Sequence, residues 1–227
     1  RFLELFPTVE PDKNHVIPHG NSSWLLGRQL PPQDVALRQR YGLGADDKVV
    51  LFFGLLAPSK GLEDLVEAFA LALEQCEARL VVAGYPTKQF DLPGVRERIS
   101  ALGIGDKVTL DLRYIPIEEI GALMDLATVV VYPYRSSTQS GSLQVAYTFG
   151  KPVIATQVGG LPEAVEDGQS GFLVPSHQPR EMAEKIAALV NDPSLAGRMG
   201  QHARHLSDTR FAWDNVARQM LDVYRAL

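Results

Sequence analysis

A loop of small, polar residues lies directly before an expected helix over residues 141–149. Its members are Ser137, Thr138, Gln139, Ser140 and Gly141. Such a loop suits a ligand rich in oxygen, because Gly141 has no Cβ to block a close approach and the free N–H groups of a helix start attract anions. A diphosphate fits this description. The alternative is a capped loop without a ligand, since Ser and Thr favour helix caps and turns for local reasons.

A second helix start follows soon after. A short apolar strand is expected over residues 152–155, followed by the Gly159-Gly160 turn and a helix that begins at Leu161 and carries Glu163 in its first turn. Two helix starts at one edge of a sheet could aim their unpaired backbone N–H groups at the same anion.

Lys60 is the cation that the pattern places best for such an anion. It follows the expected strand over residues 49–54 and opens an expected helix over residues 60–74. A lysine in a first helical turn opposes the helix dipole by about 0.3–1 kcal/mol, which a bound anion would explain. An ammonium there would stabilise the charge that builds on a departing phosphate group. The alternative is a lysine that is merely solvated at a helix start.

Six short apolar runs alternate with helical patterns. They span residues 49–54, 79–84, 107–110, 128–132, 152–155 and 171–174. Continuous rather than alternating hydrophobicity is typical of strands buried on both faces of a parallel sheet. We therefore predict an α/β fold: a doubly wound, mainly parallel Rossmann-like sheet with helices on both faces.

Helical patterns lie between and after these strands. The expected helices cover residues 33–41, 60–74, 116–126, 141–149, 161–166, 179–190, 193–206 and 211–226. The last three form a helical C-terminal segment. In an open α/β sheet, ligands bind outside the carboxyl ends of the strands, and the loops with Gly54, Gly84, Gly141 and Gly159-Gly160 all follow a strand.

The composition is that of an ordinary globular protein. Apolar residues make up 45% of the 227 residues and charged residues 22%, and this mixture can form a sizeable core. The net charge of −5 and the pI near 5.6 disfavour nucleic acid and anionic membranes as partners.

The single cysteine, Cys76, cannot form an internal disulfide. Because the sequence also has no secretory signal and no apolar run of about 18 residues, we expect a cytoplasmic location. The five histidines are scattered, so no metal site is expected. The chain begins with Arg1 inside an expected helix over residues 1–6, and we therefore expect a fragment.

Several common ligand motifs are absent. The sequence has no G-x-x-x-x-G-K-[ST], which excludes a P-loop nucleotide hydrolase. It has no G-x-G-x-x-G after the first strand and no nucleophile elbow, which disfavours a dinucleotide oxidoreductase and a serine hydrolase. The residues alone therefore indicate a phosphate-bearing ligand in an α/β crevice.

Several longer motifs, in order and at suitable spacing, carry a family resemblance. They are VIPHG (16–20), LFFGLLAPSKGLEDLVEAFA (51–70), LVVAG (80–84), IPIEEIGALMDLATVVVYPY (115–134), FGKPVIATQVGGLPEAVEDGQSGFLV (149–174) and FAWDNVARQMLDVY (211–224). From about residue 15 to its end, the chain resembles the C-terminal half of group 1, family four, glycosyltransferases.

The resemblance implies a division of the chain. Residues 1–45 would be the end of an N-terminal domain and the interdomain linker, and residues 46–227 a Rossmann-like donor-binding domain with C-terminal helices. The activity implied is a metal-independent, retaining transfer of a hexosyl group from a nucleoside-diphosphate sugar, with no cofactor. An N-terminal domain, absent here, would supply most acceptor contacts, and the last helix would touch it.

The same resemblance implies roles for individual residues. It makes Lys60 the catalytic residue, beside the donor diphosphate with Gly54. It makes the loop from Thr138 to Gly141, with Ser142 in the helix that follows, the receiver of the phosphates and sugar, together with Gly159, Gly160 and Glu163. It places Gly84 and the Arg113-Tyr114 loop near the base and ribose.

The chain departs from the family pattern at three positions. The family usually has an Arg after the strand-ending glycine, where this chain has Leu55, and often two glutamates, where this chain has Ser137 and Val145. Gln144, one residue from the second glutamate position, could accept a hydrogen bond from a ribose hydroxyl. We interpret the departures as a variant donor site. The alternatives are a non-catalytic sugar-nucleotide-binding or sensing module, or a phosphorylase or epimerase of the same architecture.

Overall fold

The computed structural model describes residues 7–8, 10, 14–27 and 33–226. The helix expected over residues 1–6 lies outside this part of the chain. The centre of the structure is one parallel sheet with strands in the order β3-β2-β1-β4-β5-β6. The strands are β1 (Val49–Phe53), β2 (Arg79–Ala83), β3 (Val108–Asp111), β4 (Ala127–Tyr132), β5 (Val153–Thr156) and β6 (Gly171–Val174). The predicted doubly wound fold is confirmed.

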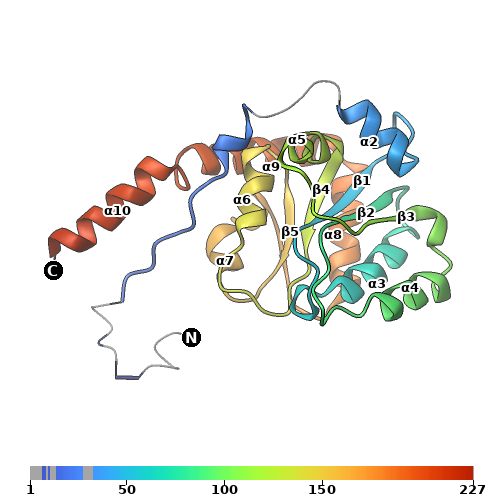
Figure 1. The fold of residues 1–227 in the computed structure, drawn as a ribbon, viewed down its shortest axis with the longest axis horizontal. Helices are drawn as coiled ribbons and strands as arrows, with labels where there is room; N and C mark the ends of the chain where they lie inside the picture. The colour runs from blue at the N-terminus through green and yellow to red at the C-terminus, as the bar shows by residue number, and fades with distance from the viewer. Residues whose placement is uncertain (1–6, 9, 11–13, 28–32, 227) are drawn as a thin grey trace.

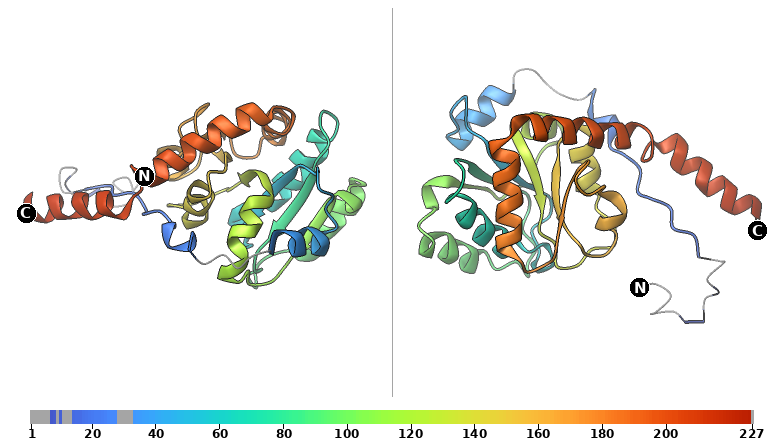
Figure 2. Two further views of the ribbon diagram at one scale, coloured as in Figure 1. Left: turned by 90° about the horizontal axis from the view of Figure 1, so that it is seen from above. Right: turned by 180° about the vertical axis from the view of Figure 1, so that it is seen from behind.

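The strands are apolar throughout because helices cover both faces of the sheet. Val50, Leu51 and Phe52 in β1 are fully buried. One face carries α3 (Leu62–Ala72), α4 (Leu92–Ala101) and α8 (Pro179–Asn191), and the other carries α5 (Ile117–Leu126), α6 (Gly141–Thr148) and α7 (Leu161–Ala164) (Figures 1 and 2). The strand order reverses between β1 and β4, which opens a crevice at their carboxyl ends.

Two helices differ from expectation. The helix expected over residues 60–74 is shorter, because Pro58–Lys60 forms a 3-10 turn (η3) and Gly61, with φ of 64°, separates it from α3. Helix α4 has no counterpart among the helices expected from the sequence. Asp91 caps this helix, its side chain accepting a hydrogen bond from the Gly94 N–H, and a proline lies in its first turn.

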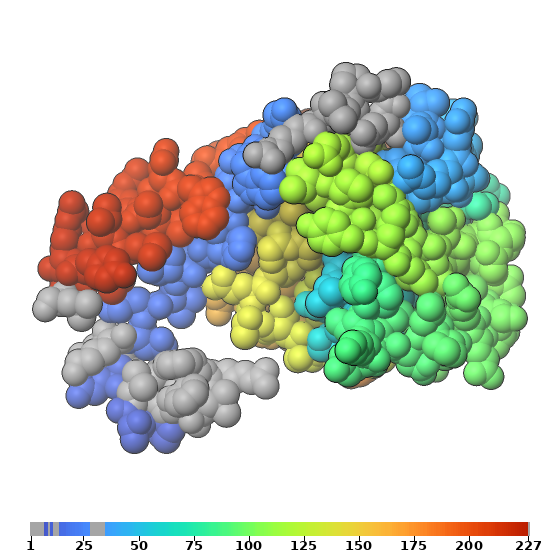
Figure 3. All heavy atoms as spheres, in the orientation of Figure 1, coloured from blue at the N-terminus to red at the C-terminus, as the bar shows by residue number. Residues whose placement is uncertain are grey.

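The remaining helices lie at the two ends of the described chain. The segment before β1, for which we keep the name linker, carries a short 3-10 turn, η2 (Ser23–Leu25), and α2 (Gln33–Tyr41), which packs against α5. A further 3-10 turn, η4 (Gly105–Lys107), precedes β3. After α8, α9 (Pro193–Asp208) packs against α6, and α10 (Trp213–Ala226) leaves the main body (Figure 3).

The linker and α10 are joined where both leave the domain. Trp213 Nε1 donates a hydrogen bond to the Asn21 carbonyl at 3.0 Å, and Asn21 N donates to the Phe211 carbonyl at 2.7 Å. On α10 the apolar stripe is partly exposed: Val216 is buried, whereas Trp213 and Tyr224 are 52% and 68% exposed.

The main chains of β1 and β2 come very close where they leave the sheet. Phe53 pairs with Ala83, so Gly54 and Gly84 follow side by side, and Gly54 has φ of 143°. A Cβ at Gly84 would overlap the carbonyl oxygen of Gly54. Only glycine therefore fits at position 84 without a shift of the backbone.

Gly84→Ala is expected to lower the free energy of unfolding by about 2 kcal/mol, because the added methyl overlaps backbone rather than a flexible side chain. Urea denaturation measures this change. The matched control is Gly105→Ala, where an added Cβ meets nothing within 4 Å and the change should stay below about 0.5 kcal/mol. Equal effects of the two substitutions would contradict the steric explanation.

Candidate functional site

Three hydroxyl groups meet at the start of α6, and we call them the hydroxyl cluster: Tyr134, Ser140 and Ser142. Ser142 Oγ lies 3.1 Å from both the Tyr134 hydroxyl and Ser140 Oγ. Ser140 also caps the helix, because its Oγ accepts a hydrogen bond from Leu143 N at 3.3 Å. A Cβ at Gly54 would lie only 3.5 Å from Ser142 Oγ. The loop after β1 thus runs directly against the start of α6.

Lys60 reaches the same cluster from η3. Its Nζ lies 3.6 Å from the centre of the Tyr134 ring, a cation–π contact. Burial lowers the pKa of Lys60 below its ordinary value, because the ammonium is partly removed from water. Lys60 lies before the N-cap of α3 rather than in the first turn of that helix, where the sequence analysis expected it. Its ammonium therefore contacts the ring of Tyr134 instead of opposing the dipole of α3 from within the first turn.

The Gly159-Gly160 turn packs onto the loop before α6. Gly160 N donates a hydrogen bond to the Thr138 carbonyl at 2.8 Å, and Gly159 has φ of 53° with its Cα facing the Ser137 carbonyl. This contact brings the starts of α6 and α7 together, as the sequence analysis expected. Gly141 and Ser142 form the first turn of α6.

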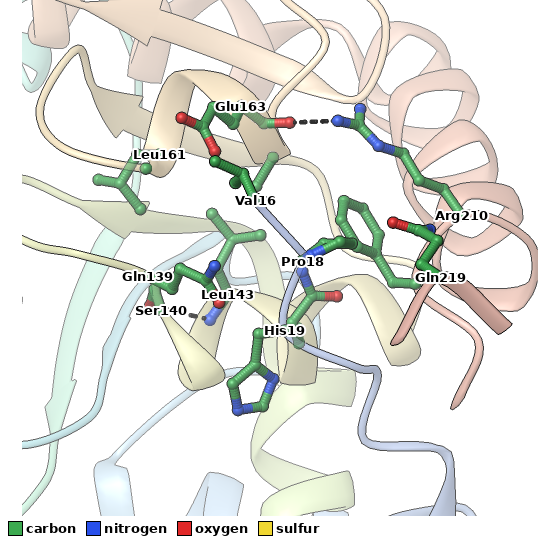
Figure 4. Close-up of a pocket in the computed structure, with 14 residues that line it drawn as sticks. Val16, Pro18, His19, Gln139, Ser140, Leu143, Leu161, Glu163, Arg210 and Gln219 are labelled. Carbon is green, nitrogen blue, oxygen red and sulfur yellow. Dashed lines mark hydrogen bonds between the residues drawn. The ribbon is translucent and has the colours of Figure 1, made fainter. Parts of the chain in front are cut away.

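A cavity of about 180 Å³ lies between the linker, α6, α7 and the start of α10 (Figure 4), and we call it the linker cavity. It contains five residues that the sequence analysis selected: Gln139, Ser140, Gln144, Gly160 and Glu163. Its other polar lining residues, His19, Arg210 and Gln219, were missed. His19 could have been selected from the sequence, because it belongs to the VIPHG motif (16–20). The sequence around Arg210 and Gln219 gives no such indication.

A second cavity of about 210 Å³ lies at the carboxyl ends of β1 and β2, and we call it the Tyr114 cavity. Four selected residues line it: Gly54, Leu55, Gly84 and Tyr114. The others are largely apolar: Phe53, Tyr85, Ile115 and Ile120. The flat, exposed ring of Tyr114 and the aliphatic side chains suit a planar apolar group. Gly54 links this cavity to the hydroxyl cluster.

Arg113 and Gln144 differ from their expected placement. The Arg113 side chain is not among the residues that line the Tyr114 cavity; its Nε donates to Asp111 Oδ1 at 2.9 Å and its other nitrogens to Glu119. Gln144 lines the linker cavity, away from Gly84 and Tyr114. It is offset from Val145 by about 100° around α6, since an α-helix has about 3.6 residues per turn.

An ion-pair network surrounds Arg113. Arg40 of α2 donates to Glu119 Oε2 at 2.9 Å, and the Tyr41 hydroxyl donates to Asp111 Oδ2 at 2.7 Å. Arg113 lowers the pKa of Glu119 by hydrogen bonding to its carboxylate. The network attaches the linker helix α2 to the loop that carries Tyr114.

No group of three or more His, Cys, Asp and Glu side chains that could hold a metal ion is present among the described residues. His202, one of the scattered histidines, has its Nε2 2.6 Å from Glu166 Oε2. Within the same part of the chain, the helices are too short or too polar to cross a membrane.

Comparisons with known proteins agree on one family. Residues 34–206 match the family described as "Glycosyl transferases group 1". The chain is 35% identical over 225 residues to D-inositol 3-phosphate glycosyltransferase of Acidothermus cellulolyticus, covering 96% of this chain and 49% of that protein. The chain spans about half the length of the curated relatives it matches.

Solved structures show the same likeness. Sucrose-phosphate synthase of Thermosynechococcus elongatus superimposes with a TM-score of 0.79 at 29% identity, over 93% of this chain and 52% of that one. HepE of Anabaena in complex with UDP superimposes with a TM-score of 0.83 at 25% identity, over 98% of this chain and 60% of that one.

Glu119→Gln is expected to lower the free energy of unfolding by about 1 kcal/mol at neutral pH, because the half-buried ion pairs with Arg113 and Arg40 lose a charge. The lowered pKa of Glu119 means that this stabilisation is present above its unfolded pKa of about 4.3 and is lost as the pH falls through the lower folded value. Urea denaturation at several pH values measures the difference.

The control is Glu118→Gln, an exposed neighbour in the first turn of α5. It should change stability little at any pH. A Glu119→Gln difference that persists undiminished at about pH 3 would contradict the assignment of the stabilisation to this carboxylate.

Proposed function

Because the chain belongs to the group 1 glycosyl transferases, we propose that it is the nucleotide-sugar-binding half of a two-domain enzyme that transfers a hexosyl group with retention of configuration. The observation that carries this proposal is the meeting of Lys60, Gly54 and the start of α6 at the hydroxyl cluster. A helix start and an ammonium together suit an anion. The cluster also lies between two cavities that could hold the two ends of a sugar nucleotide.

The donor would lie across the start of α6. The base would occupy the Tyr114 cavity, where Tyr114 and the aliphatic side chains offer planar and apolar contacts. The diphosphate would lie over Gly54 and the hydroxyl cluster. The sugar would extend toward the linker cavity, which Ser140 connects to the cluster. The UDP complex of the related HepE supports a nucleotide ligand for this fold.

Lys60 would stabilise the leaving group. As the bond between the sugar and the diphosphate breaks, negative charge builds on the departing phosphate oxygen, and an ammonium and helix N–H groups there lower the barrier. Arg135, the residue after Tyr134, is another cation near the cluster, but its Nη2 donates a hydrogen bond to Asp64 Oδ1 at 2.8 Å. With Leu55 in place of an arginine, we assign this role to Lys60 and propose that the reaction needs no metal.

The acceptor would come from a second domain. The chain spans about half of its relatives' length, and α10 exposes Trp213, Met220, Leu221 and Tyr224 beside the linker. We propose that this surface packs against an acceptor-binding domain. Alone, the chain should bind nucleoside diphosphates without transferring sugar. An upstream reading frame that does not encode a second α/β domain would favour a sensing module instead.

Lys60→Ala is expected to weaken binding of a nucleoside diphosphate about 10–100-fold, the effect of removing one charge-assisted contact, and binding of the monophosphate much less. The distal phosphate is the group nearest to this ammonium in the proposed pose. Calorimetric titration with UDP, GDP, ADP and dTDP, followed by the monophosphate of the base that binds, measures both affinities.

The matched control is Lys48→Ala. Lys48 is an exposed lysine just before β1, at the amino ends of the strands and so at the end of the sheet opposite the proposed site. It should leave both affinities unchanged. Equal losses for diphosphate and monophosphate in Lys60→Ala would show that Lys60 supports the structure rather than the phosphate. No binding of any of the four diphosphates by the unaltered chain would refute the proposed function.

A further inference from the structure

Two cations lie where η3 meets the loop after β4, and their surroundings differ. The charge of Arg135 is compensated, because its Nη2 lies 2.8 Å from Asp64 Oδ1 and 3.2 Å from Glu63 Oε2. Lys60 is half-buried and forms no side-chain hydrogen bond or ion pair within the part of the chain that the structure describes. Its Nζ lies instead over the ring of Tyr134, 3.6 Å from the ring centre. The N–H donors of this ammonium therefore remain open to a ligand.

The ring of Tyr134 is fixed from several sides. Tyr134 is only 2% exposed, and its ring packs edge-on against Tyr132 with 5.6 Å between the ring centres. Its hydroxyl lies 3.1 Å from Ser142 Oγ at the start of α6. Its carbonyl accepts a hydrogen bond from Thr156 Oγ1 of β5 at 2.6 Å. Contacts from β4, β5 and α6 thus hold the ring in one orientation.

The backbone beside Lys60 is joined to the loop that carries Tyr134. Arg135 N donates a hydrogen bond to the Ser59 carbonyl at 2.9 Å. A Cβ at Gly61 would overlap the carbonyl oxygen of Pro133, so the two main chains are in direct contact there. The lysine side chain between these points is long and flexible. The ring of Tyr134 therefore fixes the ammonium end of a side chain whose backbone end is already fixed.

An aromatic ring suits this task better than a carboxylate. A carboxylate would neutralise the ammonium, as Asp64 and Glu63 do for Arg135, and an incoming phosphate would have to displace it. The face of an aromatic ring attracts a cation without neutralising its charge. Ordering a long side chain in advance also removes part of the entropy cost of binding.

We propose that Tyr134 is a positioning residue for the transfer reaction: its ring holds the Lys60 ammonium beside the hydroxyl cluster, and this placement gives the site a preference for nucleoside diphosphates over monophosphates. This inference rests on the proposed function, because Lys60 is assigned there to the distal phosphate. The ring of Tyr134 acts on the donor through Lys60.

The test compares Tyr134→Phe with Tyr134→Leu by calorimetric titration of the full chain with UDP and UMP. If another base binds better in the diphosphate panel, the two nucleotides of that base replace these. Tyr134→Phe keeps the ring and should lose little of the preference for the diphosphate. Tyr134→Leu removes the ring and should lower that preference about tenfold relative to Tyr134→Phe, the order of effect of a desolvated cation–π contact.

A second substitution separates the ring's charge distribution from its packing. Tyr134→trifluorophenylalanine keeps a ring of similar shape, but the fluorines withdraw electrons from its face and weaken its attraction for an ammonium. Relative to Tyr134→Phe, this variant should weaken binding of UDP several-fold. Its affinity for UMP and its melting temperature should stay unchanged, because the packing is kept.

A double-mutant cycle shows whether Tyr134 acts through Lys60. In a Lys60→Ala background, Tyr134→Leu should cause no further loss of the diphosphate preference. The matched control is Tyr147→Leu, which removes a buried tyrosine of α6 whose hydroxyl contacts Ser170. It should lower the melting temperature through lost packing and leave the preference unchanged.

The outcomes separate the two ideas. No binding of UDP or of any other diphosphate by the unaltered chain overturns the proposed function, and this inference with it. A preference that is lost in Lys60→Ala but kept in Tyr134→Leu and Tyr134→trifluorophenylalanine overturns the role of Tyr134 alone. An increased preference in either variant also overturns it, because the ring would then compete with the phosphate for the ammonium. Equal losses from Tyr134→Leu with and without Lys60 would show a structural role.

Discussion

The contact between the main chains of Gly54 and Gly84 is the constraint on which the site depends. It holds the ends of β1 and β2 so close that no side chain fits between them at Gly84. As a result, Gly54 sits against Ser142 on one side and borders the Tyr114 cavity on the other. The sheet order places β4 beside β1, so the loop before α6 reaches the same point. A small set of backbone contacts thus brings together loops from distant parts of the chain.

The candidate site around the hydroxyl cluster is made mainly of polar groups that carry no charge. Backbone N–H groups at the starts of α6 and α7 and the hydroxyl cluster supply most of its polarity, and Lys60 adds one cation held over Tyr134. Oriented neutral donors cost less to remove from water than charges do, so such a site can remain partly buried when empty. The proposed donor site would therefore not depend on charged side chains at Leu55, Ser137 and Val145.

The sheet could be predicted from the sequence because burial on both faces leaves a strong apolar signal in each strand, as in VVLFF of β1. The glycine loops of the site could be predicted because they follow strands. Helix α4 could not, since its apolar positions are sparse. The partners of Arg113 and His202 lie on other elements, and the wall formed by His19 and Arg210 joins segments 191 positions apart. Patterns of residue type within a short stretch of sequence do not predict such contacts.

The junction of the linker with α10 has a mechanical consequence. Trp213 Nε1 donates to the Asn21 carbonyl and its ring lies against Gly20, so the linker and α10 are joined to each other where both leave the domain. In the proposed two-domain enzyme, a movement of the second domain would therefore displace both segments together. Because His19 lies on one and Gln219 on the other, such a displacement would move two walls of the linker cavity at once. In the proposed enzyme, rotation between the two domains would therefore change the width of the linker cavity.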